Sequence, residues 1–165
     1  MKKFTLAAVL MLVVCPTFIF ASAKPNFTGT WVMDKSRSEG IPAGAEQVMT
    51  LTQSDDKLDL HNKITTDAGE NLVNDTYIIN GKEVEFTQKV NDQESKGKRT
   101  SKWLADGSGF ESSEEVTRQL GDGTTIKQQV TRKWVMTADG KSFTVDMTIN
   151  GPNGTQQTKR VFVKK

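Results

Sequence analysis

Hydrophobic and polar residues alternate along much of the chain in short runs. Three runs show the alternation most clearly, with apolar positions at Val84, Phe86 and Val90, at Ile126, Val130, Trp134 and Met136, and at Phe143, Val145, Met147 and Ile149. The positions between them are mostly polar or charged. A period of two, with one apolar face and one polar face, is typical of strands in an antiparallel sheet that covers a core.

Turn signals rich in Asp, Asn and Gly separate these runs. They lie at residues 54–56, 67–69, 80–81, 91–92, 105–107, 121–123, 138–140 and 151–154. These turns join nine strands, and a further strand around Trp31 precedes them. Ten consecutive antiparallel strands with short connections predict an all-β, up-and-down meander that closes into a barrel and so removes its edges. Residues 35–45 break the alternation, and we expect a loop or one short helical turn there.

The apolar positions also predict a strand register. A tight turn at residues 138–141 would place Met136 opposite Phe143 and Trp134 opposite Val145. Apolar side chains then meet apolar side chains at each step, as cross-strand packing requires.

The N-terminus has the features of a removable secretion signal. Two lysines follow Met1, an apolar run covers residues 4–20, and the small residues Ala21-Ser22-Ala23 form a cleavage site. We therefore expect a signal peptide at 1–23, a single domain at 24–165, and a periplasmic or secreted product. An uncleaved anchor is the alternative, because about 18 apolar residues can span a membrane. With cleavage, no stable membrane span is expected.

Charge and composition exclude several functions. The chain has 22 basic and 20 acidic residues, and removal of Lys2 and Lys3 with the signal leaves a neutral domain without a basic block. Nucleic acid is therefore not an expected partner. The one cysteine, Cys15, lies in the signal, and the one histidine, His61, is expected on the outer face, so we expect no metal site and no cofactor. No nucleophile elbow or phosphate loop is present, so no enzyme activity is expected.

The segment Phe27-Thr28-Gly29-Thr30-Trp31 contains a Gly-x-Trp motif. It resembles the opening of the calycin superfamily, the lipocalin-like proteins, in which this motif closes the barrel floor. The resemblance implies that Gly29 lets the chain bend close to its neighbours and that the indole of Trp31 seals one end. More generally, the chain looks like the small exported lipocalin-like proteins of bacteria.

Residues 158–164 are similar to the last strand of the fatty-acid-binding proteins, another calycin family. In that family an Arg-x-Tyr pair points inward and holds a ligand carboxylate. The resemblance implies this role for Arg160, while Phe162 replaces the tyrosine and removes one hydrogen bond. Ten strands also match that family, whereas true lipocalins have eight. The family's helix pair does not fit into residues 35–45.

Arg132 lies between Val130 and Trp134 on an apolar face. A buried guanidinium needs a partner, because an uncompensated buried charge is costly. That partner is either a ligand anion held by two hydrogen bonds or the carboxylate of Glu114 on the preceding strand. A strand bulge that turns Arg132 into water is a third reading.

Arg160 depends on the register of the last strand. If Phe162 opposes Phe143, Arg160 opposes Val145 and points into the barrel. If the register slips by one residue, Arg160 points into water. Both registers stay open at this stage.

These observations lead to the hypothesis of an exported protein that binds a small hydrophobic or amphipathic ligand, such as a lipid or fatty acid. The candidate ligand-binding residues are Arg132, Arg160, Trp134, Phe162, Phe86, Phe110 and Met147. The alternative is a non-enzymatic protein-interaction module of the cell envelope with a filled β core. A cofactor-free enzyme that uses Glu114 is a weaker rival. The oligomeric state is left open.

Overall fold

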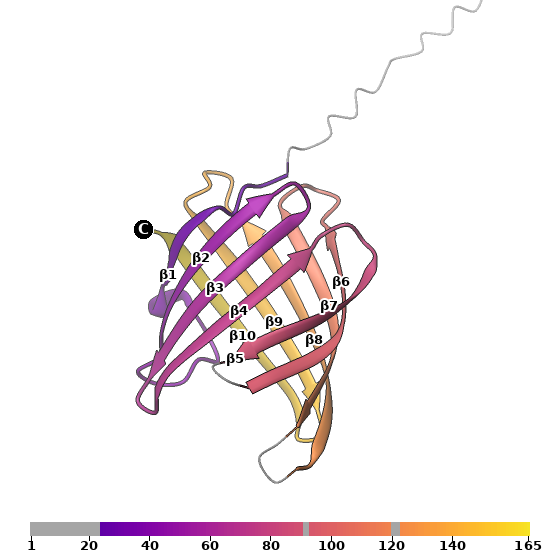
Figure 1. Cartoon of the computed structure of the whole chain (residues 1–165). Coiled ribbons are helices and arrows are strands. Elements are labelled where there is room, and N and C mark those ends of the chain that lie inside the picture. Colours follow the sequence, from indigo (N-terminus) through magenta and orange to yellow (C-terminus); the bar gives the residue numbers. More distant parts are fainter. Residues whose placement is uncertain (1–23, 91–92, 120–122) are drawn as a thin grey trace, which may run out of the picture.

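The computed structural model describes residues 24–90, 93–119 and 123–165 (Figure 1). The signal peptide expected at residues 1–23 lies outside the described residues. In the described part of the chain, ten antiparallel strands form one closed barrel in which each strand bonds to its neighbours in sequence and β1 bonds to β10. The all-β, up-and-down, ten-stranded barrel predicted from the alternation and the turns is therefore confirmed.

The elements follow the predicted order. They are β1 (Gly29–Met33), the 3-10 turn η1 (Lys35–Arg37), β2 (Glu46–Ser54), β3 (Lys57–Thr66), β4 (Gly69–Ile78), β5 (Glu83–Val90), β6 (Gln93–Trp103), β7 (Gly109–Gln119), β8 (Thr125–Met136), β9 (Ser142–Gly151) and β10 (Gly154–Lys164). The expected loop with one short helical turn between the first two strands is confirmed by η1. Asp34 caps it, since its carboxylate accepts from the backbone N–H of Ser36 at 3.0 Å.

The register between the last three strands agrees with the apolar pattern. Met136 faces Phe143 and Trp134 faces Val145, as predicted. On the other side of β9, Val145 faces Arg160. Arg160 therefore has the inward register, and Trp134, Val145 and Arg160 form one row across β8, β9 and β10.

A cluster of aromatic rings fills one end of the barrel. Phe143 lies at its centre, with ring centroids 4.8 Å from Trp31, 5.5 Å from Trp134 and 5.0 Å from Phe162. Phe110 stacks on the other side of Trp134 at 5.3 Å. Phe110, Trp134 and Phe143 all lie next to the turns that join β6 to β7 and β8 to β9, so the cluster occupies the end of the barrel where those turns lie.

Gly29 and Trp31 belong to this closed end. Trp31 is fully buried, and its indole N–H donates to the carbonyl of Phe27 at 2.8 Å. Gly29 has φ +145°, which L side chains rarely adopt, and a Cβ there would lie 3.0 Å from Cε of Lys164. The ammonium of Lys164 in turn lies 5.3 Å from the Trp31 ring centroid. Both residues therefore lie at the closed end of the barrel.

The wall has one weak seam, between β4 and β5. The described residues pair there at Val73–Val90 and Asn74–Lys89. Farther along, β4 residues 75–78 and β5 residues 83–88 form no ladder pairs with each other. By contrast, β3 and β4 pair along their whole length, from Lys57–Ile78 to Thr66–Gly69. Side chains, and not backbone hydrogen bonds, close this part of the barrel.

Candidate ligand-binding cavity

A cavity of about 380 Å³ lies inside the barrel, beyond the aromatic cluster. Its wall comes from β2, β3, β4, β5, β8, β9 and β10, and Trp134 and Phe162 belong to both the cavity and the aromatic cluster. The wall is mixed, with apolar side chains such as Met49, Leu60 and Met147 beside a nearly equal share of polar surface. This volume is in the lower part of the range of about 300–1,000 Å³ that is typical of small-molecule sites. The interaction-module alternative predicts a completely filled interior, and the barrel does not have one.

Five of the seven candidate ligand-binding residues line this cavity: Arg132, Trp134, Met147, Arg160 and Phe162. The strand alternation identified the inward face of Arg132, Trp134 and Met147, whereas it left the faces of Arg160 and Phe162 open.

The prediction that Phe110 lines the wall is wrong. Phe110 is fully buried inside the aromatic cluster, between the rings of Trp134 and Trp103. It points inward as the alternation indicates, but it lies at the second position of β7, next to a turn at the closed end. Alternation reports the face of a side chain and not its depth along the barrel.

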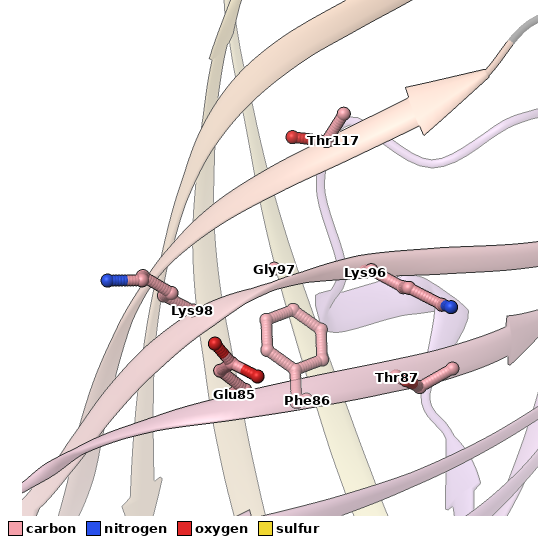
Figure 2. Close-up of a pocket in the computed structure, with 7 residues that line it drawn as sticks. All are labelled: Glu85, Phe86, Thr87, Lys96, Gly97, Lys98 and Thr117. Carbon is pink, nitrogen blue, oxygen red and sulfur yellow. The ribbon is translucent and has the colours of Figure 1, made fainter.

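The prediction that Phe86 lines the cavity is also wrong. Its ring lies over Arg99, with 4.0 Å between the ring centroid and Cζ. Figure 2 shows the ring leaning from β5 towards Gly97 on β6. A Cβ on Gly97 would lie 3.1 Å from the Phe86 ring and 2.0 Å from the carbonyl oxygen of Glu115, so only glycine leaves room there. Phe86 therefore packs against the wall instead of reaching the centre.

A buried ionic cluster closes the seam between β4 and β5. The guanidinium of Arg99 donates to both oxygens of Asp75 at 2.9 and 2.7 Å, to Glu114 at 3.0 Å and to the carbonyl of Thr76 at 2.7 Å. The side chains of Arg99, Asp75 and Glu114 are almost completely buried. Arg132 also donates to Glu114. Two guanidinium groups thus meet two carboxylates, and the cluster is neutral as a whole.

Aromatic rings and an amide complete this cluster. The Arg99 guanidinium lies between the rings of Tyr77 and Phe86, at 4.1 and 4.0 Å from their centroids. From β5, the Gln88 amide donates to Asp75 at 2.9 Å across the seam. Burial raises the pKa of the Tyr77 phenol, so that ring stays neutral at physiological pH.

The ion-pair alternative for Arg132 is therefore present in the structure. Burial disfavours its charge, but the charge and the hydrogen bond of the Glu114 carboxylate favour it, and on balance the pKa of the Arg132 guanidinium is raised. Because Glu114 already meets the charge of Arg132, this residue does not need a ligand to be stable.

Arg160 has a different environment. Its Nη1 donates to the amide oxygen of Gln47 at 3.1 Å, while its Nε is buried without a hydrogen-bond partner. In the part of the chain that the structure describes, no carboxylate forms an ion pair with it. Burial, followed by repulsion from Arg132, lowers the pKa of the Arg160 guanidinium. Arg160 thus brings a positive charge to the cavity wall that the described residues do not neutralise.

Two residues of the cavity wall each carry a buried polar atom that has no hydrogen-bond partner among the described residues. They are Nε1 of Trp134, which is a donor, and Oδ1 of Asn62, which is an acceptor. Trp134 lies in the same row as Arg160, with Val145 between them. Neighbouring strands in a sheet are about 4.8 Å apart. Long side chains on β8 and β10 can therefore contact the same ligand group if it lies above Val145 on β9.

Sequence reasoning missed Arg99, Asp75, Asn62 and Gln47. The run at β6, Gln93–Trp103, is polar on both faces, so no apolar face marked the inward position of Arg99. The cross-strand neighbours of Arg99 do indicate its inward face, because Arg99 pairs with the apolar Val84 on β5 and with the buried Glu114 on β7. His61 is exposed, as expected, and its Nδ1 lies 2.7 Å from Oδ1 of Asn74 on the outer face.

No helix among the described residues is long and apolar enough to span a membrane. No protein-family model matches the chain, and no curated protein matches it. A similar solved structure is the zebrafish ileal bile acid-binding protein complexed with cholic acid. It shares 19% sequence identity over 84% of this chain and 98% of that chain, with a TM-score of 0.48. What this chain binds therefore has to follow from its own cavity.

Proposed function

We propose that this protein is an exported, non-enzymatic binding protein for one small amphipathic acid. The acid group would lie near Arg160 and the Nε1 of Trp134, and the apolar body would lie along the wall formed by residues such as Met49, Leu60 and Met147. The observation that carries the proposal is the partly buried guanidinium of Arg160, which lacks a carboxylate partner in the described chain.

The chemistry of the two cavity arginines supports this choice. A charge that is partly removed from water without a counter-ion lowers the stability of the fold, and a bound anion relieves this cost. Arg132 has Glu114, whereas Arg160 has only the neutral amide of Gln47. A ligand carboxylate at Arg160 would form charge-assisted hydrogen bonds, which are roughly twice as strong as neutral ones.

The absence of catalysis is part of the proposal. Glu114, the carboxylate considered for a cofactor-free enzyme, lies between the guanidinium groups of Arg99 and Arg132. Both guanidinium groups thus engage this carboxylate in buried ion pairs, which gives it a structural role. Export rests on the features of residues 1–23 alone.

Binding of dodecanoic acid and dodecanol to the purified protein tests the function. Trp134 lies at the cavity wall, so its fluorescence should change as a ligand enters. We expect saturable binding of both probes with tighter binding of the acid, and a one-to-one complex by native mass spectrometry. Absence of saturable binding by either probe would contradict the proposal. Equal affinity for acid and alcohol would leave a lipid-binding barrel but remove Arg160 as the acid site.

A further inference from the structure

Asn62 presents a second polar contact in the cavity. It lies on β3, only 8% of its surface is exposed, and its Oδ1 has no hydrogen-bond partner among the described residues. Its cross-strand neighbours are the apolar residues Met49 on β2 and Val73 on β4. A buried amide oxygen that is left unpaired is costly, and native proteins contain few of them.

Asn62 and the proposed acid site lie on strands that are far apart around the barrel. Trp134 lies on β8, and β3 is the fifth strand from β8 in either direction around the ring. Asn62 and Trp134 therefore lie on opposite sides of the barrel. The first offers a hydrogen-bond acceptor, and the second offers a donor beside the charge of Arg160.

We propose that Asn62 selects ligands that carry a hydroxyl group in addition to the acid, so that the natural ligand is a hydroxylated amphipathic acid. This proposal rests on the proposed function, because it assumes that an acid occupies the same cavity. The hydroxyl would donate to Oδ1 of Asn62 while the acid group accepts from Arg160 and Trp134. An unsubstituted fatty acid would place methylene groups against the Asn62 oxygen and leave it unpaired.

The apolar surroundings make the contact selective. Leu60 and Val73, which line the same side of the cavity, offer no hydrogen bond to a hydroxyl. A ligand hydroxyl that lies beside these two residues regains through Asn62 the hydrogen bonds that it loses on leaving water. A site built to hydrogen-bond a substrate hydroxyl discriminates strongly against the analogue that lacks it.

The experiment compares dodecanoic acid with a series of monohydroxydodecanoic acids that differ in the position of the hydroxyl. Dissociation constants are measured by calorimetry for the wild type, for Asn62→Leu, and for Asn74→Leu as a matched control on the outer face. We expect at least one hydroxy acid to bind about tenfold more tightly than dodecanoic acid to the wild type. Asn62→Leu should abolish this preference and strengthen binding of dodecanoic acid, and Asn74→Leu should change neither.

The outcomes separate the two proposals. If no acid binds, both fail. If dodecanoic acid binds and no hydroxy acid binds more tightly, the hydroxyl contact is wrong and the acid site stands. The same conclusion follows if Asn62→Leu keeps the preference of the wild type. Should Asn62→Leu fail to fold, the wild-type comparison and the shift of the Asn62 side-chain amide signals in an NMR titration with the preferred hydroxy acid decide the question.

Discussion

Arg160 donates a hydrogen bond of 3.1 Å to Gln47, a residue 113 positions earlier in the chain. Both residues lie just outside the segments of β10 and β2 that pair with the short strand β1. The contact therefore joins β10 to β2 directly. Because an amide carries no charge, Gln47 orients the guanidinium without neutralising it. A binding site for an anion requires a guanidinium that is held in place and whose charge is not already neutralised.

The first prediction concerns Arg160 itself. Arg160→Gln removes the charge but keeps a polar side chain, so we expect the affinity for dodecanoic acid to fall by at least about tenfold, as is typical for loss of a charge-assisted hydrogen bond. Binding of dodecanol should stay the same. Tryptophan fluorescence titrations measure both. Lys159→Gln, an exposed change on the same strand, is the control and should affect neither ligand. Parallel losses for acid and alcohol would show that Arg160 acts only through the shape of the cavity.

The second prediction concerns the charge balance of the ionic cluster. Glu114→Gln would leave Arg99 and Arg132 with one carboxylate between them, that of Asp75. Breaking a buried ion pair on one side costs about 3–5 kcal/mol, so the free energy of unfolding should fall by about this amount. Glu115→Gln, the next residue on the outer face, should cost less than about 0.5 kcal/mol. Urea denaturation of the two variants checks this, and similar stabilities would contradict the role given to the cluster.

The third prediction concerns Gly97, where β6 and β7 approach closely. A Cβ at this position would lie 2.0 Å from the backbone oxygen of Glu115, so the strands would have to move apart. We expect Gly97→Ala to destabilise the fold by about 1–3 kcal/mol, as overpacking does. In Gly151→Ala the nearest atom is the side-chain amide of Gln128 at 3.2 Å, which can move, so this control should be milder. Thermal unfolding of both variants would show the difference, and an unaffected Gly97→Ala would refute the close approach.

The fourth prediction concerns acid stability. Hydrogen bonds from Ser36 and then Arg37 lower the pKa of Asp34 from 3.8 to about 2. A carboxyl group with a lower pKa in the folded state stabilises the fold while it is ionised. This contribution is complete above pH 3.8 and is lost as the pH falls towards 2. An NMR titration of the Asp34 carboxyl carbon should therefore have its midpoint near 2, and Asp34→Asn should flatten the dependence of stability on pH in this window. A midpoint at 3.8 would mean that the cap does not hold the carboxylate.

The fold could be predicted because its determinants are local. The alternation around Trp134 and Val145 and the turns between strands identify both the faces and the register, which the structure confirms. The same logic gave two registers for Arg160, because Val161 and Phe162 are both apolar and do not separate the faces. Strand pairing over the whole barrel decides between them.

The site could be predicted only in part, because depth and partners depend on distant contacts. Phe110 has the correct face but lies in the packed end, and nothing near it in the sequence indicates this. Arg99 meets Asp75, which is 24 positions away, through a seam that exists only in the closed barrel. A charged side chain on a strand with two polar faces carries no local sign of burial.

The seam between β4 and β5 has a consequence for the behaviour of the protein under stress. Where backbone ladder pairs are missing, the ring depends on the contacts of Arg99, Asp75 and Gln88 to stay shut. If heat or mutation loosens these contacts, β4 and β5 become two unpaired sheet edges, and such edges are templates for pairing with another chain. Resistance of this barrel to aggregation would then depend on these few polar side chains at the β4–β5 seam.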